Sequence, residues 1–312
     1  MSIKSFQYIG SLALVLFGLP SLAQQGVLPV LQAPASAESL AKGATTMGNS
    51  TSGFIYNNPA AIFNKDTQFS VDYSLGLFPT EDKTMHLHTV STAYKQGKSA
   101  FFIGGRYFSM GNITALWDSE MNPISNGRTL DLYSYALDLG YAYKLSDSFV
   151  AYAKAGYANE RMISDIKAYH STFGVFYNGS INKTNYSIGV EASNLGVYKY
   201  KDKTESLPSL LKVGGAVEFS IRESQVLEVA SNYGVFLPNG DQKAKSHFNI
   251  GANYTFWNKY SILAGTHLGE KNDYLTAGLG LKHKGVRVHL ASKLAARTDL
   301  ENAYMLDIGY SF

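Results

Sequence analysis

Nine charged residues occur at alternating positions within apolar segments, where they could line a polar channel. They are Asp72, Arg106, Asp138, Lys154, Glu191, Lys212, Glu218, Arg287 and Asp307. An arginine or lysine exposed to lipid at the middle of a membrane costs about 2 to 4 kcal/mol. If these segments cross a membrane, the nine side chains therefore point into a lumen. There they would form a network of ion pairs, or the walls of a polar conduction path.

Other residue types offer little catalytic or metal chemistry. The chain has no cysteine, which excludes thiolate zinc sites, iron–sulfur clusters and cysteine nucleophiles. It contains no Gly-x-Ser-x-Gly turn of a serine hydrolase. His86 and His88 share one face of a predicted strand, a spacing that can chelate a metal, but the sequence offers no third ligand. We expect no enzyme activity, no metal site and no cofactor.

The elements that hold these residues follow an export signal. Residues 1 to 23 combine a basic start at Lys4, an apolar stretch of about a dozen residues, and small residues before Gln24. A helix that spans a membrane needs roughly 20 apolar residues, so this stretch is too short for an anchor. We predict a signal peptide that is cleaved after Ala23.

Residues 24 to 66 form a second segment, rich in Ala, Ser, Thr, Gly and Asn and without strand alternation. The Ala-rich stretch from Ser36 to Met47 predicts one short helix with Ser36 as its N-cap. A turn motif follows, made of Asn57, Asn58, Pro59 and Ala60. The proline restricts its predecessor to extended geometry. We predict an N-terminal plug or cap, in which this motif has a structural or gating role.

From residue 67 to 312 the chain consists of runs with strict period-two alternation, separated by clusters of turn-forming residues. There are fourteen runs, which start near residues 67, 84, 98, 131, 147, 168, 184, 209, 225, 246, 259, 273, 285 and 302. The run from 133 to 143 is typical, because its odd positions are Tyr or Leu and its even positions Ser, Ala, Asp or Gly.

The length of these runs favours a membrane barrel over a soluble sandwich. Strands of globular proteins average about 5 to 6 residues, whereas a tilted strand of about 10 residues spans the hydrocarbon layer. Backbone groups in lipid must pair internally, which a closed barrel achieves. We therefore predict an all-β protein, a 14-stranded antiparallel transmembrane β-barrel over residues 67 to 312 with the short plug segment before it.

The connections should differ between the two ends of this barrel, because such barrels have short periplasmic turns and longer extracellular loops. Ser146-Asp147 and residues 282 to 285 predict periplasmic turns. The segments 110 to 130, 158 to 167 and 236 to 245 predict extracellular loops.

Charge and composition limit the partners. The 27 basic and 24 acidic residues interleave, for a net charge of +3, and no Lys/Arg cluster tracks a phosphate backbone. We expect no nucleic-acid partner. An outward face of Tyr, Leu, Val and Phe predicts contact with outer-membrane lipid, and hence a bacterial outer-membrane location.

Several motifs resemble a known group of proteins. They are Ser36-Ala37-Glu38-Ser39-Leu40-Ala41-Lys42-Gly43-Ala44, Tyr56-Asn57-Asn58-Pro59-Ala60-Ala61, Glu191-Ala192-Ser193-Asn194-Leu195-Gly196, Leu207-Pro208-Ser209-Leu210-Leu211-Lys212-Val213-Gly214 and Leu275-Thr276-Ala277-Gly278-Leu279-Gly280-Leu281-Lys282. In order along the chain, they resemble FadL-like outer-membrane proteins, in particular the PorV/PorQ-like branch. The resemblance departs at Thr45-Thr46-Met47-Gly48, where that branch often has a Gly-Gly pair.

Two functions follow from this resemblance. A PorV/PorQ-like role implies help in type IX protein secretion or cargo attachment at the cell surface, with secretion-system subunits or exported proteins as partners. A FadL-like role implies a channel that takes up fatty acids or other hydrophobic small molecules. Of the two, the sequence leads us to expect the secretion role, with hydrophobic transport as the alternative.

Overall fold

The structure is a computed structural model that describes residues 28–80, 83–117, 123–161, 165–238, 244–270, 272–295 and 302–312. Within these ranges, residues 113–117 and 123–128 are described by their backbone alone. The predicted signal peptide, residues 1 to 23, lies outside the described residues.

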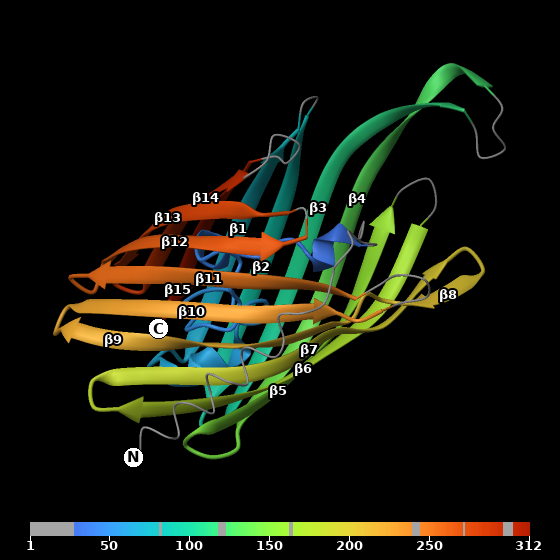
Figure 1. Cartoon of the computed structure of the whole chain (residues 1–312). Helices are drawn as coiled ribbons and strands as arrows, with labels where there is room; N and C mark the ends of the chain where they lie inside the picture. Colours follow the sequence, from blue (N-terminus) through green and yellow to red (C-terminus); the bar gives the residue numbers. More distant parts are fainter. Residues whose placement is uncertain are drawn as a thin grey trace.

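The period-two runs of the sequence form a closed antiparallel barrel of fourteen strands (Figure 1). The barrel strands are β1 (Phe69–Pro79), β2 (Thr84–Gln96), β3 (Ser99–Trp117), β4 (Pro123–Lys144), β5 (Phe149–Arg161), β6 (Asp165–Ile181), β7 (Thr184–Tyr200), β9 (Leu210–Arg222), β10 (Gln225–Phe236), β11 (Lys245–Phe256), β12 (Tyr260–Gly269), β13 (Tyr274–His283), β14 (Val286–Ala295) and β15 (Ala303–Ser311). A short additional strand, β8 (Lys203–Ser206), pairs with the end of β7. The predicted fold class and strand count are thus confirmed.

Each strand pairs with its sequence neighbours, and the first strand closes the barrel against the last. β1 pairs with β15 from Ser70↔Ser311 to Leu77↔Tyr304. Closure leaves no edge strand that would have to meet lipid with unpaired backbone groups. Among the described residues, no helix is long and apolar enough to cross a membrane.

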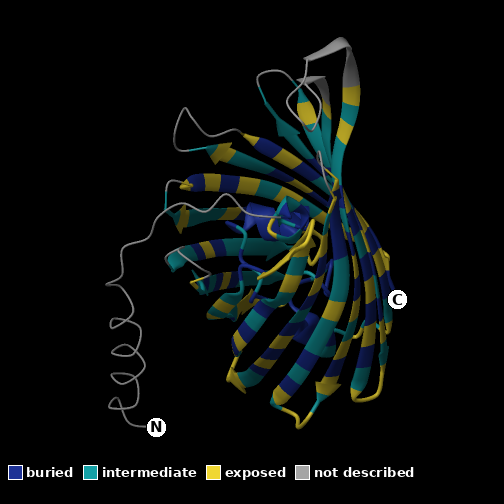
Figure 2. Cartoon of the chain, turned by 90° about the vertical axis from the view of Figure 1, so that its right-hand side faces the viewer, coloured by how far each residue is buried: buried dark blue, intermediate teal, exposed yellow. Residues whose placement is uncertain are grey.

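The two faces of the wall differ in burial, as the alternating bands of Figure 2 show. On β4 the outward Leu137 and Leu139 are 60% and 64% exposed, whereas Asp138 between them is 2% exposed. Aromatic side chains form rows near both ends of the strands, as at Tyr135 and Tyr157 or at Phe149 and Tyr177. An apolar outer band between aromatic girdles is the pattern of a membrane barrel.

The segment before β1 folds inside the barrel, where Figure 1 draws it in blue. It contains the 3₁₀ turn η1 (Pro29–Leu31), the helix α2 (Ala37–Ala41) and the 3₁₀ helix η2 (Pro59–Asn64). We call residues 28–64 the plug. Its backbone reverses often, as its small and turn-forming residues predict.

Helix α2 is shorter than predicted. Its N-cap is the predicted one, since the Ser36 hydroxyl accepts a hydrogen bond from the Ser39 N–H at 3.1 Å. It ends at Ala41, and two residues later Gly43 has a left-handed φ of 69° and donates its N–H to Thr276 Oγ1 at 3.0 Å. A Cβ at this glycine would lie 2.4 Å from the Thr266 carbonyl oxygen. The barrel wall therefore stops the helix.

The hydrophobic core lies between the plug and the inner wall, in three clusters. Phe54 and Ile62 pack with Phe102 and Phe176 of the wall. The second cluster joins the start of the plug to β2 and β3, and the third packs α2 against β12 to β15. Burying each large apolar side chain contributes about 1.5 to 3 kcal/mol, so these clusters hold the plug in place.

Two predicted loops are wrong. Most of the segment 110 to 130 is strand, because β3 and β4 continue pairing beyond the rest of the barrel (Figure 1). The segment 158 to 167 is also mostly strand, since β5 ends at Arg161 and β6 begins at Asp165. Alternation fades once a hairpin leaves the membrane, so hydrophobic pattern alone misses paired strands there.

Candidate functional site

A cavity of about 670 Å³ lies inside the barrel between the plug and the wall. Apolar plug residues line part of it, among them Leu31, Leu40 and Ile55. Charged side chains of the wall line the rest, and they are Arg106, Lys154, Glu191, Lys212, Lys245, Glu270 and Lys293. This volume falls within the range of pockets that bind small molecules.

One wall of the cavity, formed by β3 to β6, surrounds the plug residue Tyr56. Its hydroxyl donates a hydrogen bond to Asp138 Oδ2 at 3.0 Å. The Arg106 guanidinium lies 4.4 Å from the centre of the Tyr56 ring and 4.0 Å from the same carboxylate. Burial raises the pKa of Tyr56, and Asp138 raises it further, so the phenol stays protonated.

Glycines in this wall make room for the polar side chains. A Cβ at Gly104 would lie 2.4 Å from the Tyr56 hydroxyl oxygen. A Cβ at Gly156 would lie 2.6 Å from Asp138 Oδ1 and 2.7 Å from the His170 ring. Any side chain at either glycine would therefore displace the cluster.

Several buried polar atoms here have no hydrogen-bond partner among the described residues. They are Arg106 Nε, Asp138 Oδ1, both ring nitrogens of His170, and Thr172 Oγ1. Such atoms are rare in folded proteins and cost free energy when left unpaired. Of these atoms, Arg106 Nε and Thr172 Oγ1 belong to residues that line the cavity, whereas Asp138 Oδ1 and His170 Nε2 lie 3.6 Å from each other.

A second ion pair lies beside the first group. Lys212 Nζ is 2.6 Å from Glu191 Oε1 and donates to Thr46 Oγ1 of the plug at 3.0 Å. The Tyr152 hydroxyl donates to the other oxygen of Glu191. Lys212 and Glu191 thus each have a partner of opposite charge and a further hydrogen-bond partner.

Lys154 lies between these two groups and has no ion pair within the described part of the chain. Its Nζ is 5.3 Å from the centre of the Tyr56 ring. On this wall three cations, Arg106, Lys154 and Lys212, face two carboxylates, Asp138 and Glu191, which leaves one positive charge in excess. The cavity can therefore accept a ligand with a negative or hydrogen-bond-accepting end.

The opposite wall, from β10 to β13, presents flat rings. His267 stacks on Tyr274 with a centroid distance of 4.7 Å and on His247 at 5.5 Å. His247 also meets the Phe236 ring at 5.8 Å, and His267 Nδ1 is 2.6 Å from Asn249 Oδ1. These rings offer a surface on which an apolar or aromatic molecule can pack.

The predicted charged residues do not form a single network. Five of the nine meet at or beside the cavity, and the other four make their contacts elsewhere in the barrel. The five are Arg106, Asp138, Lys154, Glu191 and Lys212. Arg287 pairs with Asp72 at 2.7 Å, and Asp72 also accepts the Gly53 N–H of the plug at 3.2 Å. Asp307 accepts two N–H groups at the start of α2, and Glu218 accepts the amide of Asn49.

The plug motif holds the plug together. Asn57 donates its side-chain amide to Ser36 Oγ and to the Ser52 carbonyl, both at 2.9 Å. Asn58 caps η2 by accepting the Ala60 N–H at 3.0 Å, and it donates to the Gly48 carbonyl at 2.9 Å. Pro59 begins η2, where its missing N–H costs nothing.

The predicted histidine pair lies away from the cavity, near the outer surface. His88 Nδ1 is 2.8 Å from the Tyr73 hydroxyl in an exposed contact, and His86 precedes it by two residues on β2. Among the described residues, no group of three His, Cys, Asp or Glu side chains is placed to hold a metal ion.

The cavity reaches the wall where its hydrogen-bond ladder is interrupted. β7 pairs with β9 as far as Ser193↔Leu210, and with β8 from Val197↔Ser206 onward. Between these pairs Asn194 adopts a left-handed φ of 56°, and Pro208 has no N–H to donate. Ser193, Asn194 and Leu210 all line the cavity.

Comparison with solved structures finds the same architecture in transporters. The Ralstonia pickettii toluene transporter TbuX matches with a TM-score of 0.61 over 89% of this chain and 98% of its own, at 13% identity. The P. putida toluene transporter TodX matches over the same shares, with the same TM-score and identity. A Pseudomonas aeruginosa FadL homologue covers 92% of this chain and 100% of its own, with a TM-score of 0.52 at 11% identity.

The chain has the FadL-like barrel fold. At these identities the likeness concerns the fold alone. No family model and no curated protein matches the sequence.

In this FadL-like barrel, two of the sequence motifs meet. The run Ser193-Asn194-Leu195-Gly196 on β7 lies against Leu207-Pro208-Ser209-Leu210 before and at the start of β9. The Leu207 N–H donates to the Gly196 carbonyl at 2.9 Å, and Ser209 Oγ donates to the Asn194 carbonyl at 3.3 Å. One backbone bond and one side-chain bond thus bridge part of the interrupted ladder.

The FadL-like barrel also contains a buried ion trio that sequence reasoning missed. Lys42 Nζ lies 3.3 Å from Glu38 Oε1 and 3.4 Å from Glu228 Oε1. The other oxygen of Glu38 accepts bonds from Thr51 and Ser52. The spacing of Glu38 and Lys42, four residues apart in a predicted helix, signals this pair. No local sequence pattern indicates Glu228, the third member of the trio.

Proposed function

We propose that the protein is a bacterial outer-membrane channel that takes up hydrophobic small molecules through the cavity beside its plug. The observation that carries this proposal is the junction of cavity and wall. The cavity reaches the interrupted ladder at Ser193, Asn194 and Leu210, so a ligand inside it lies beside a stretch of wall where the pairing of β7 with β9 has ended. The exit that we propose for a lipid-soluble molecule is a lateral opening at this stretch.

Three further features support this role. The plug is packed and hydrogen-bonded to the wall along its length, which leaves the cavity beside it as the space for a ligand. The rings of His267 and Tyr274 suit an apolar or aromatic body. The excess positive charge near Lys154 suits a molecule with an acidic or hydrogen-bond-accepting end. The role requires no catalytic step.

The similar solved structures support hydrophobic transport over secretion. Those structures are of two toluene transporters and a FadL homologue. The secretion role implied by the PorV/PorQ-like resemblance gains no support from them or from the cavity, and it stays a prediction.

The experiment that tests the proposal fills the cavity at its junction with the wall. Leu210 lines the cavity, whereas its neighbour Leu211 is 45% exposed on the outer face. We expect Leu210→Trp to lower the uptake of labelled toluene and oleate by about tenfold, equivalent to about 1.4 kcal/mol. Uptake is measured in cells that express equal amounts of folded barrel.

Leu211→Trp is the matched control, since it adds the same side chain to the outer face. Its uptake should equal that of the unchanged protein. Equal uptake by both variants and by cells without the protein would overturn the proposed transport role.

A further inference from the structure

Two lysines lie directly opposite each other on the outer face of the barrel, away from the cavity. Lys167 of β6 and Lys199 of β7 are Cα partners in the ladder, and both are exposed. Arg161, at the end of the neighbouring strand β5, is exposed as well. We call these three residues the basic patch.

The basic patch lies just beyond an aromatic girdle. Tyr135, Tyr157 and Tyr169 form a row on the outer face, with centroid distances of 6.2 and 5.3 Å. Lys167 lies on the same face of β6 as Tyr169, two residues earlier in the sequence and therefore roughly 7 Å nearer the start of the strand. Girdle tyrosines mark the interface between hydrocarbon and head groups, so the two lysines reach the depth of the head groups.

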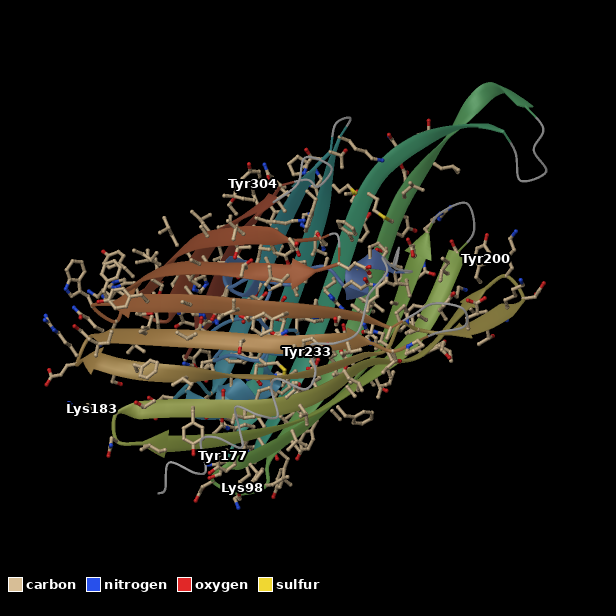
Figure 3. All side chains as sticks on the ribbon, viewed as in Figure 1. Lys98, Tyr177, Lys183, Tyr200, Tyr233 and Tyr304 are labelled. Atoms are coloured by element: carbon tan, nitrogen blue, oxygen red, sulfur yellow. The ribbon has the colours of Figure 1, made fainter. Side chains whose placement is uncertain are left out.

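This end of the barrel is the outer one. At the opposite end strands are joined by turns of a few residues, where Lys98 and Lys183 lie, and short turns are periplasmic in such barrels. Figure 3 shows Tyr200, the residue after Lys199, at the end opposite Lys98 and Lys183. The basic patch therefore faces the outer leaflet.

The patch has more positive than negative charge. Like charges directly opposite in an antiparallel ladder destabilise it. Asp165, on the same face of β6, pairs in the ladder with Arg161, and both it and Asp131 of β4 interact electrostatically with that arginine. Three cations and two carboxylates leave an excess of one positive charge, and both carboxylates act on Arg161, which leaves Lys167 and Lys199 to face the depth where lipid phosphates lie.

We propose that Lys167 and Lys199 bind a phosphate group of the phosphorylated glycolipid that forms the outer leaflet. Two ammonium groups from adjacent strands reach one phosphate, and Arg161 lies beside them to contact it. Beneath them Tyr169 and Val197, which are 67% and 44% exposed, form an apolar surface for an acyl chain of the same lipid. The inference rests on the proposed outer-membrane location and not on transport through the cavity.

The test measures lipid retained by the purified full-length barrel in neutral detergent. Diphosphoryl lipid A is added, and the bound molecules are counted by native mass spectrometry. We expect the double variant Lys167→Gln/Lys199→Gln to retain about tenfold less lipid A than the unchanged protein, about 1.4 kcal/mol. Lys98→Gln/Lys183→Gln, which removes two lysines at the periplasmic end, should retain the normal amount.

Three outcomes would overturn the proposal. They are equal retention by both double variants, equal retention of dephosphorylated lipid A, and equal competition by phosphatidylglycerol, which would indicate a general attraction to phosphate lipids. Heat-modifiable migration in gels verifies that each variant is a closed barrel. Toluene uptake should stay unchanged in Lys167→Gln/Lys199→Gln, so failure of lipid binding and failure of the transport role are separate results.

Discussion

Lys154 differs from its neighbours Arg106 and Lys212 because no ion pair joins it to a carboxylate among the described residues. Arg106 pairs with Asp138, and Lys212 pairs with Glu191. A cation without a partner beside a cavity is where the charge of a ligand has most effect. Specificity for the polar end of a ligand therefore resides at this residue, whereas the stacked rings opposite contribute surface alone.

The substitution Lys154→Gln tests this assignment. We expect it to weaken binding of oleate by about tenfold, which corresponds to about 1.4 kcal/mol and is close to the value of a hydrogen bond to a charged group. Binding of toluene, which has no charge, should not change. Both are measured by equilibrium binding to the purified barrel. An equal loss for both ligands would show that the substitution acts through the shape of the cavity.

Glu38 is the residue on which the interior of the plug depends most. Glu38→Gln removes one charge from the trio with Lys42 and Glu228, and it leaves Lys42 with a single carboxylate. Breaking a buried ion pair from one side costs about 3 to 5 kcal/mol. We expect faster hydrogen exchange over residues 38–53, measured by mass spectrometry, and little change in the barrel strands. Glu223→Gln, in an exposed turn, serves as the control.

The same contacts predict how the plug responds to acid. Burial alone would raise the pKa of Glu38, but the Lys42 charge and the Thr51 hydrogen bonds outweigh it and lower the pKa from 4.5 to about 2. A lowered pKa stabilises the folded state above the unfolded value. Plug protection should therefore hold at pH 7 and pH 5 and decline as the pH falls from 4.5 toward 2. Protection lost near pH 6 would contradict this.

At the scale of the strands, alternation determines which side chain meets lipid. Leu137→Arg places a charge on the outer face of β4 and should destabilise the barrel by about 2 to 4 kcal/mol. Asp138→Asn keeps a polar side chain facing inward, and it should assemble nearly normally. The comparison is the amount of heat-modifiable barrel in outer membranes. Equal assembly of the two variants would reverse the assigned faces.

Strands were predictable from the sequence because their signal is local, whereas several features of the site are not local. The predicted starts lie close to the observed ones except at β4, which begins at Pro123 and not near residue 131. Alternation alone predicted Arg106, Lys154, Glu191 and Lys212, but it missed Lys245, Glu270 and Lys293, which also line the cavity. The division of the predicted residues into separate groups depends on strand register and on the plug, which join residues 82 and 186 positions apart.

Two other features were beyond sequence reasoning for a different reason. β8 is four residues long, too short for a period-two pattern to be recognised. The ladder interruption depends on a left-handed backbone at Asn194, which asparagine tolerates but does not require. The stacking of His247 on His267 likewise follows from the pairing of β11 with β12, which no local sequence pattern shows.

For the whole molecule, the seam between β1 and β15 determines whether the barrel exists. The Phe312 carbonyl accepts the N–H groups of Gln68 and Phe69, and its own N–H donates to Phe69. Deleting Phe312 removes all three bonds together with the ring that packs on Phe69 at 5.4 Å. We expect this deletion to lower the yield of folded barrel in the membrane several-fold, at about 1 kcal/mol per bond.

The comparison for that experiment is deletion of Asn239, which comes between β10 and β11 in the sequence and lies outside the described residues. Connections tolerate changes in length better than ladders do. Its yield should stay near normal. If both deletions inserted equally well, closure at this seam would not limit assembly.

The hydrogen bonds from Asp307 to the start of α2 also constrain the order in which the molecule is built. Ala37 and Glu38 come before β1, whereas Asp307 belongs to β15, 270 and 269 positions later. The helix consequently gains this anchor only when β15 has joined the wall. While β15 is unpaired the wall is open and α2 lacks its carboxylate partner, so closure of the barrel and attachment of the helix are coupled.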